Sequence, residues 1–158
     1  MRPMAPTDGH FSTAVLLIAH GSRHAPANAD LHELAIRFAA TGLYAVVEGC
    51  FLELAEPDIA TGGDRCVARG AHRVLMIPYF LSAGVHLIRD LTAARDELLV
   101  RHPGVEFRLG PALGPHPLLD NLVSERIRQL DTGETAAMLD VPPGIAELYA
   151  PIEPHRPA

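Results

Sequence analysis

Four short apolar segments alternate along the chain with four segments in which apolar residues recur at helical spacing. The apolar segments span residues 13–19, 44–54, 73–78 and 105–109. The segments with helical spacing span residues 31–42, 57–70, 88–102 and 118–130. Continuous apolar, partly β-branched runs are typical of strands buried on both faces. The alternation therefore predicts an α/β fold: βαβ units that build a parallel four-stranded sheet with helices on both faces.

The chain is predicted to hold one such domain, over residues 13–130, with a tail at each end. Its 158 residues fit a single domain with a sizeable core. Residues 1–12 contain two prolines and a glycine without periodicity, which indicates a loose N-terminal tail. Residues 131–158 hold five prolines and two glycines among scattered apolar residues. We expect them to form an irregular or partly helical C-terminal tail.

Composition limits the class of protein. Apolar residues make up 48% and charged residues 20%, which is ordinary for a globular domain, and the net charge of −6 argues against a nucleic-acid partner. No apolar run approaches the ~20 residues of a membrane span, and none has a signal-peptide pattern, so a cytoplasmic location is predicted. Cys50 and Cys66 form no metal or redox motif and are predicted to be structural.

Three loops that leave the carboxyl ends of predicted strands carry polar residues. They span residues 19–24, 53–57 and 78–86. Ligands of open parallel sheets bind beyond the carboxyl ends of the strands. If the three strands are neighbours, the loops converge on one crevice, which is where we expect the chemistry.

His20, His86 and Glu53 are the candidate metal and catalytic residues of that crevice. Two imidazoles with open positions and a nearby carboxylate suit Co²⁺, Fe²⁺, Ni²⁺ or Zn²⁺. A core role for His20, a solvated loop role for His86 and a helix-dipole role for Glu56 stay open as structural alternatives. His24 and His116 are further candidates for the same crevice. The other histidines are expected to lie on the surface; they are His10, His32, His72, His102 and His155.

The same loops carry a family resemblance. The segments 16–23, 51–57, 78–86 with Asp90, and 114–117 occur in an order that resembles the class II chelatases. This group includes sirohydrochlorin cobaltochelatase and ferrochelatase. The resemblance covers residues 13–130 and implies a flavodoxin-like fold and a metal chelatase, a lyase of siroheme or cobalamin synthesis, that inserts Co²⁺ or Fe²⁺ into sirohydrochlorin or a related tetrapyrrole.

The resemblance also implies residue roles. His20 and His86 are the metal ligands, and His20 is in addition a base toward the pyrrole N–H. The segment around Glu53 and the loop after the third strand contact the tetrapyrrole; the loop residues are Leu81, Ser82, Ala83, Gly84 and Val85. A single-domain chain closes its cleft as a homodimer. The divalent metal is a substrate, and no organic cofactor is expected. We add Arg23 as a partner for substrate carboxylates, because guanidinium matches their geometry.

Three other functions stay open on sequence grounds. A strand that ends in His-Gly is also found in phosphohistidine enzymes, although there an arginine precedes the histidine and here Ala19 does. A non-catalytic metal- or tetrapyrrole-binding protein would carry the same ligands. A chelatase fold that has lost its activity would also look alike. Phosphatase assays and absorbance titration with sirohydrochlorin separate these possibilities.

Overall fold

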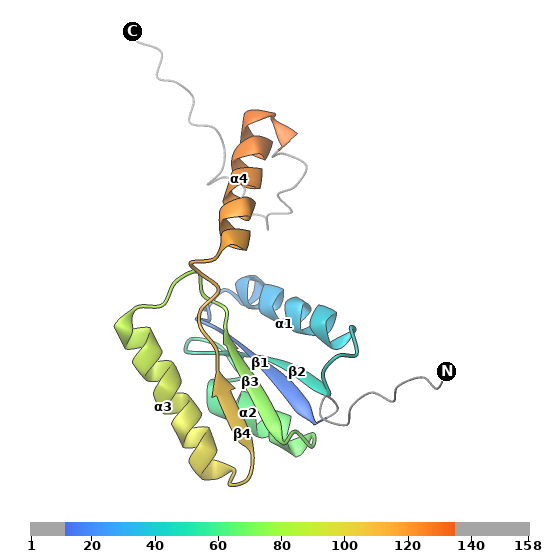
Figure 1. The fold of residues 1–158 in the computed structure, drawn as a ribbon, viewed down its shortest axis with the longest axis vertical. Helices are drawn as coiled ribbons and strands as arrows, with labels where there is room; N and C mark the ends of the chain where they lie inside the picture. Colours follow the sequence, from blue (N-terminus) through green and yellow to red (C-terminus); the bar gives the residue numbers. More distant parts are fainter. Residues whose placement is uncertain (1–11, 135–158) are drawn as a thin grey trace, which may run out of the picture. The chain divides into compact units, whose positions relative to one another are not determined.

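The structure is a computed structural model that describes residues 12–134. It consists of two compact units, which divide between His116 and Pro117. The described part of the first unit contains four strands and three helices (Figure 1). In chain order these are β1 (Thr13–Ala19), α1 (Ala25–Ala39), β2 (Val46–Phe51), α2 (Ile59–Ala68), β3 (Arg73–Pro78), α3 (Val85–Arg101) and β4 (Glu106–Leu109). The second unit begins with α4 (Pro117–Asp131).

The four strands form one parallel sheet in the order β2-β1-β3-β4. β1 is a central strand, and Leu16 in its middle pairs with Glu48 of β2 on one side and Met76 of β3 on the other. Helix α1 packs against one face of the sheet, and α2 and α3 pack against the other. The predicted fold class, a parallel four-stranded sheet with helices on both faces, is confirmed.

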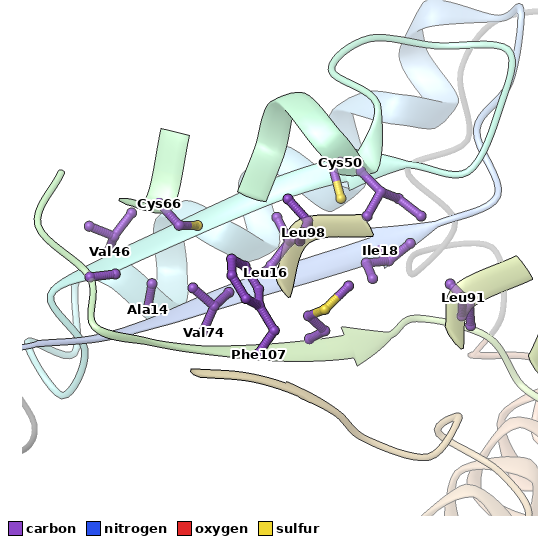
Figure 2. Close-up of a cluster of buried hydrophobic side chains, with 13 residues drawn as sticks. Ala14, Leu16, Ile18, Val46, Cys50, Cys66, Val74, Leu91, Leu98 and Phe107 are labelled. Atoms are coloured by element: carbon purple, nitrogen blue, oxygen red, sulfur yellow. The ribbon is translucent and has the colours of Figure 1, made fainter. Parts of the chain in front are cut away.

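Alternate residues of β1 enter two separate hydrophobic clusters. Ala14, Leu16 and Ile18 lie fully buried beneath α2 and α3 (Figure 2). Val15 and Leu17 point to the opposite face, where they pack with residues of α1. Successive side chains of a strand point to opposite faces, so a strand covered on both sides needs an unbroken apolar run. This explains the composition of residues 13–19.

Two helices begin earlier than their apolar patterns predict. α1 begins at Ala25 rather than near Leu31, and α3 begins at Val85 rather than near Ile88, so that His86 lies inside the first turn of a helix. The residues of these additional first turns are mostly exposed, so they do not extend the periodic apolar pattern of the buried face. Leu99 belongs to the apolar pattern of residues 88–102, but 40% of it is exposed. It follows buried Leu98 by one position, about 100° around the helix.

The start of α2 also differs from the prediction. Pro57 begins the segment of helical spacing at residues 57–70, but in the structure it precedes the cap residue Asp58. Asp58 Oδ1 accepts a hydrogen bond of 2.8 Å from the backbone N–H of Thr61. This bond satisfies one of the free donors at the helix start and lowers the pKa of the Asp58 carboxyl.

The cysteines are structural as predicted, whereas one histidine is not where it was expected. Cys50 and Cys66 are buried, and burial raises the pKa of Cys50 and brings that of Cys66 to about 12. His102, expected to lie on the surface, is half-buried, and its Nε2 lies 2.6 Å from Oδ1 of Asp64. Arg101 bonds the other oxygen of Asp64, so the pair ties the end of α3 to α2.

In the second unit, α4 is amphipathic. Arg128 bonds Glu125 one turn earlier, which lowers the pKa of Glu125 to about 2. The exposed large apolar side chains of α4 are Leu118, Leu122, Val123, Ile127 and Leu130. Among the described helices, α4 included, none is long and apolar enough to cross a membrane. The predicted tails, with His10 and His155, lie outside the described residues apart from the short stretches next to the domain.

Candidate functional site

The predicted convergence of loops occurs at the carboxyl edge of the sheet. β1 lies between β2 and β3, and its pairing continues beyond the strand ends. The N–H groups of Leu52 and Glu53 donate to the carbonyls of Ala19 and His20, at 2.8 and 3.0 Å. The N–H of Tyr79 donates to Ile18 at 2.6 Å. The backbone thus places the loops after β1, β2 and β3 side by side.

Gly21 allows the first two loops to approach each other closely. Its φ of +96° is a conformation that side chains disfavour. A Cβ on Gly21 would lie only 1.9 Å from the carbonyl oxygen of Glu53. The close approach expected at this glycine is confirmed, and the neighbour is the backbone of the second loop.

Leu54, directly after Glu53, adopts φ +64°, a left-handed conformation that costs about 1–2 kcal/mol for a side-chain-bearing residue. The loop is closed at its base, because the N–H of Phe51 donates to the carbonyl of Pro57 at 2.9 Å. Such strained positions persist where the surrounding structure over-determines them and gather at functional sites.

Asn28, on the first turns of α1, holds the loop that carries His20. Its Oδ1 accepts from the N–H of Ser22 at 2.9 Å, and its Nδ2 donates to the carbonyl of Ser22 at 2.8 Å. No sequence pattern singles out Asn28, because it precedes the apolar pattern of residues 31–42. Only the early start of α1 brings its amide back to Ser22.

His20 and Glu53 face each other. Nε2 of His20 lies 3.1 Å from Oε1 of Glu53, and Nδ1 lies 3.2 Å from the carbonyl oxygen of Gly21. Because a carbonyl can only accept, Nδ1 is assigned the hydrogen. Nε2 then keeps a lone pair that lies 3.1 Å from a carboxylate oxygen, so the two groups could share a cation, a proton or a metal ion. Both side chains are more than half exposed, at 56% and 57%, so such a cation can reach them from solvent.

The pair opens into a crevice of about 540 Å³. Its other lining residues are Leu52, Phe80, Leu87 and Asp90. A few polar groups among apolar walls are typical of small-molecule sites. Asp90 belongs to α3 and was not predicted as a site residue. Its spacing of four from His86, one helical turn, is the signal that could have found it.

His86 is exposed and does not line this crevice, although Leu87 beside it does. Among residues 12–134, no three His, Cys, Asp or Glu side chains stand close enough to hold a metal ion. The structure therefore brings His20 and Glu53 together and places His86 one helical turn from Asp90.

The other polar candidates lie around the crevice rather than in it. Arg23 and His24 are exposed, and His24 is the residue before α1. Glu56 accepts a 3.2 Å hydrogen bond from the N–H of Asp58, which supports its structural alternative at the helix start. His116 is exposed at the end of the first unit.

The predicted substrate loop lies between β3 and α3. Leu81 and Val85 are 70% and 63% exposed, and Gly84 is the N-cap of α3. Ser82 and Ala83 line a second cavity of about 540 Å³, formed with α3 and the loop after β4. The apolar side chains of this loop thus face solvent beside the crevice, a pattern typical of interaction sites.

The chain is similar in sequence to known proteins. The CbiX family model matches residues 14–130. The chloroplastic sirohydrochlorin ferrochelatase of Arabidopsis thaliana is 34% identical over 114 residues, 72% of this chain and 51% of that protein.

Solved structures give the same picture. A cobalamin (vitamin B12) biosynthesis CbiX protein from Marinobacter aquaeolei VT8 superposes with a TM-score of 0.64 at 29% identity, over 74% of this chain and 95% of that one. The sirohydrochlorin chelatase SirB from Bacillus subtilis subspecies spizizenii, in complex with cobalt, superposes with a TM-score of 0.69 at 28% identity. The match covers 75% of this chain and 50% of that one. The present chain spans about half the length of the curated relatives it matches first.

Proposed function

Because this chain belongs to the CbiX family, we propose that it inserts a divalent metal ion, Co²⁺ or Fe²⁺, into sirohydrochlorin or a related tetrapyrrole. The observation that carries the proposal is the pair of His20 and Glu53, 3.1 Å apart in an open crevice at the carboxyl edge of the sheet. Relatives named as sirohydrochlorin ferrochelatases and cobaltochelatases support the substrate class. Ni²⁺ as an alternative metal and the lack of an organic cofactor stay predictions.

The metal ion would sit between Nε2 of His20 and Oε1 of Glu53. Ligand bonds of about 2.1 Å at a right angle place two donor atoms about 3 Å apart. The observed 3.1 Å fits two neighbouring ligands of one ion. A small number of protein ligands leaves coordination positions on the metal open. An enzyme that must release its metal requires such open positions.

His86 would complete the metal site. It belongs to the first turn of α3, whose next residue, Leu87, lines the crevice. The segment before it, Ser82-Ala83-Gly84, is made of small residues that can adjust their backbone at low cost. We therefore place His86 as the ligand that engages when metal and macrocycle are bound.

The macrocycle would lie against the apolar walls of the crevice, Leu52, Phe80 and Leu87. Exposed Leu81 and Val85 would cover its edge, and Arg23 would pair with peripheral carboxylates. As the metal moves into the ring, His20 is freed and can take up a pyrrole proton.

A second copy of the chain would close the open side of the crevice. Large apolar side chains stand exposed beside it, among them Leu54, Leu81 and Val85 at 50%, 70% and 63%. Helix α4, taken by itself, exposes a further apolar series. We propose a two-fold homodimer that covers such surfaces. Light scattering after gel filtration should give twice the chain mass; a monomer at assay concentration contradicts it. The predicted cytoplasmic location is part of the proposal.

Anaerobic absorbance assays with purified protein, sirohydrochlorin and Co²⁺ or Fe²⁺ test the function. We expect metal insertion by the unaltered chain and its loss in His20→Ala and His86→Ala, both with unchanged circular dichroism. His72→Ala is the matched control, since His72 is exposed at the amino end of β3. Full activity in both site variants would reject the assignment. Binding of metal and macrocycle without insertion would favour the non-catalytic alternative.

A further inference from the structure

Metal insertion into a tetrapyrrole requires proton acceptors. The free macrocycle carries two N–H groups at its centre, and a divalent ion replaces both protons. His20 can take one proton after it releases the metal, as proposed above. Glu53 is proposed above as the other ligand of the metal, so a carboxylate outside the ligand set is the group that can take up a proton before the metal leaves the protein.

Asp90 lies in the same crevice on a different element. His20, Leu52 and Glu53 come from the loops after β1 and β2, whereas Asp90 and Leu87 come from α3. Asp90 therefore lines the crevice from the α3 wall. A flat ligand held between these walls would meet the metal-bearing pair and the Asp90 carboxylate from different directions.

The Asp90 carboxylate is not committed to a structural bond. Within residues 12–134, it takes part in no hydrogen bond or ion pair. Asp96, on the same helix, differs, since its Oδ1 lies 2.7 Å from Nη2 of Arg95. Asp58 and Asp64 likewise hold α2 and α3 in place. An unengaged carboxylate beside apolar Leu87 is thus available to a ligand.

We infer that Asp90 accepts a pyrrole N–H proton of the macrocycle during metal insertion. The N–H bond breaks, the proton passes to a carboxylate oxygen of Asp90, and the electron pair stays on the nitrogen. That nitrogen then donates the pair to the incoming metal ion. The proton leaves Asp90 for water when the product dissociates. The inference rests on the proposed chelatase function and assigns a role to a carboxylate outside the proposed ligand set.

Single-turnover insertion of Co²⁺ into sirohydrochlorin tests this role with four proteins: the unaltered chain, Asp90→Asn, Asp90→Glu and Asp96→Asn. The amide in Asp90→Asn keeps the size of the side chain but cannot take up a proton. We expect its insertion rate constant to fall about 100-fold or more, as for other lost general bases. Asp90→Glu should recover part of the rate, and Asp96→Asn should match the unaltered chain.

Two binding measurements separate a proton acceptor from other roles. Calorimetry with Co²⁺ alone and fluorescence titration with sirohydrochlorin alone should give unchanged affinities for Asp90→Asn. A loss of Co²⁺ affinity that parallels the loss of rate would make Asp90 a metal ligand and overturn the inference. An unchanged insertion rate in Asp90→Asn would also overturn it. If the unaltered chain inserts no metal, the proposed function fails, and the role of Asp90 falls with it.

Discussion

Gly21→Ala should separate the two loops that carry His20 and Glu53. The new Cβ would lie 1.9 Å from the carbonyl oxygen of Glu53, whereas real Cβ atoms keep at least 3.0 Å from such neighbours. The loops must therefore part by about 1 Å. The 3.0 Å hydrogen bond from the N–H of Glu53 to the carbonyl of His20 spans the same gap and would be lost.

The magnitude follows from two effects. Alanine at φ +96° costs about 1–2 kcal/mol, and the lost hydrogen bond about 1 kcal/mol more. We expect a free energy of unfolding lower by about 3 kcal/mol, which leaves a domain of ordinary stability folded. A misplacement of this size can lower a rate about 100-fold, so metal insertion should fall accordingly.

Gly70→Ala is the matched control. Gly70 has a similar φ, +91°, but its Cβ would have no neighbour within 4 Å. It should lose only the conformational part, about 1–2 kcal/mol, and keep full insertion activity. Urea unfolding and the insertion assay measure both variants. The reasoning is refuted if Gly21→Ala is no less stable than Gly70→Ala, or if it inserts metal at the normal rate.

Three further predictions concern residues outside the pair of His20 and Glu53. Asn28→Asp keeps the oxygen that accepts from Ser22 but removes the Nδ2 donor to the Ser22 carbonyl. The rate of metal insertion should fall about tenfold with unchanged circular dichroism. Normal activity would contradict the role of Asn28 in holding the loop. Burial raises the pKa of Cys50 and brings that of Cys66 to about 12. At pH 8 a thiol reagent should therefore label the two cysteines only as fast as the protein unfolds. Immediate labelling of the folded protein would contradict this expectation. Asp58→Ala should lower the free energy of unfolding by about 1 kcal/mol at pH 7 through the lost helix cap. Because the bond from Thr61 lowers the pKa of Asp58 in the folded state, this stabilisation is present above pH ~4 and is lost as pH falls through the lowered pKa; urea titrations that show the same difference at pH 7 and pH 2 would refute it.

Part of the candidate site was open to prediction because it follows from strand ends. His20 and Glu53 each come directly after an apolar run, and parallel strands end at one edge. Asn28 was not predicted, and Asp90 entered only as part of the resemblance, without a role, since neither stands at a strand end. Each lies on a first or second helical turn whose helix begins before its apolar pattern does.

The amino-acid sequence by itself determined the sheet, its helices on both faces and the edge where the polar loops gather. Periodicity is a local property, and an unbroken apolar run such as residues 13–19 has few solutions other than a strand covered on both sides. The tertiary structure alone decided which loops are neighbours. The order β2-β1-β3-β4 and the register of β1 against β2 set His20 beside Glu53 at 3.1 Å. Such distances depend on pairing between segments more than thirty residues apart, which no local pattern encodes.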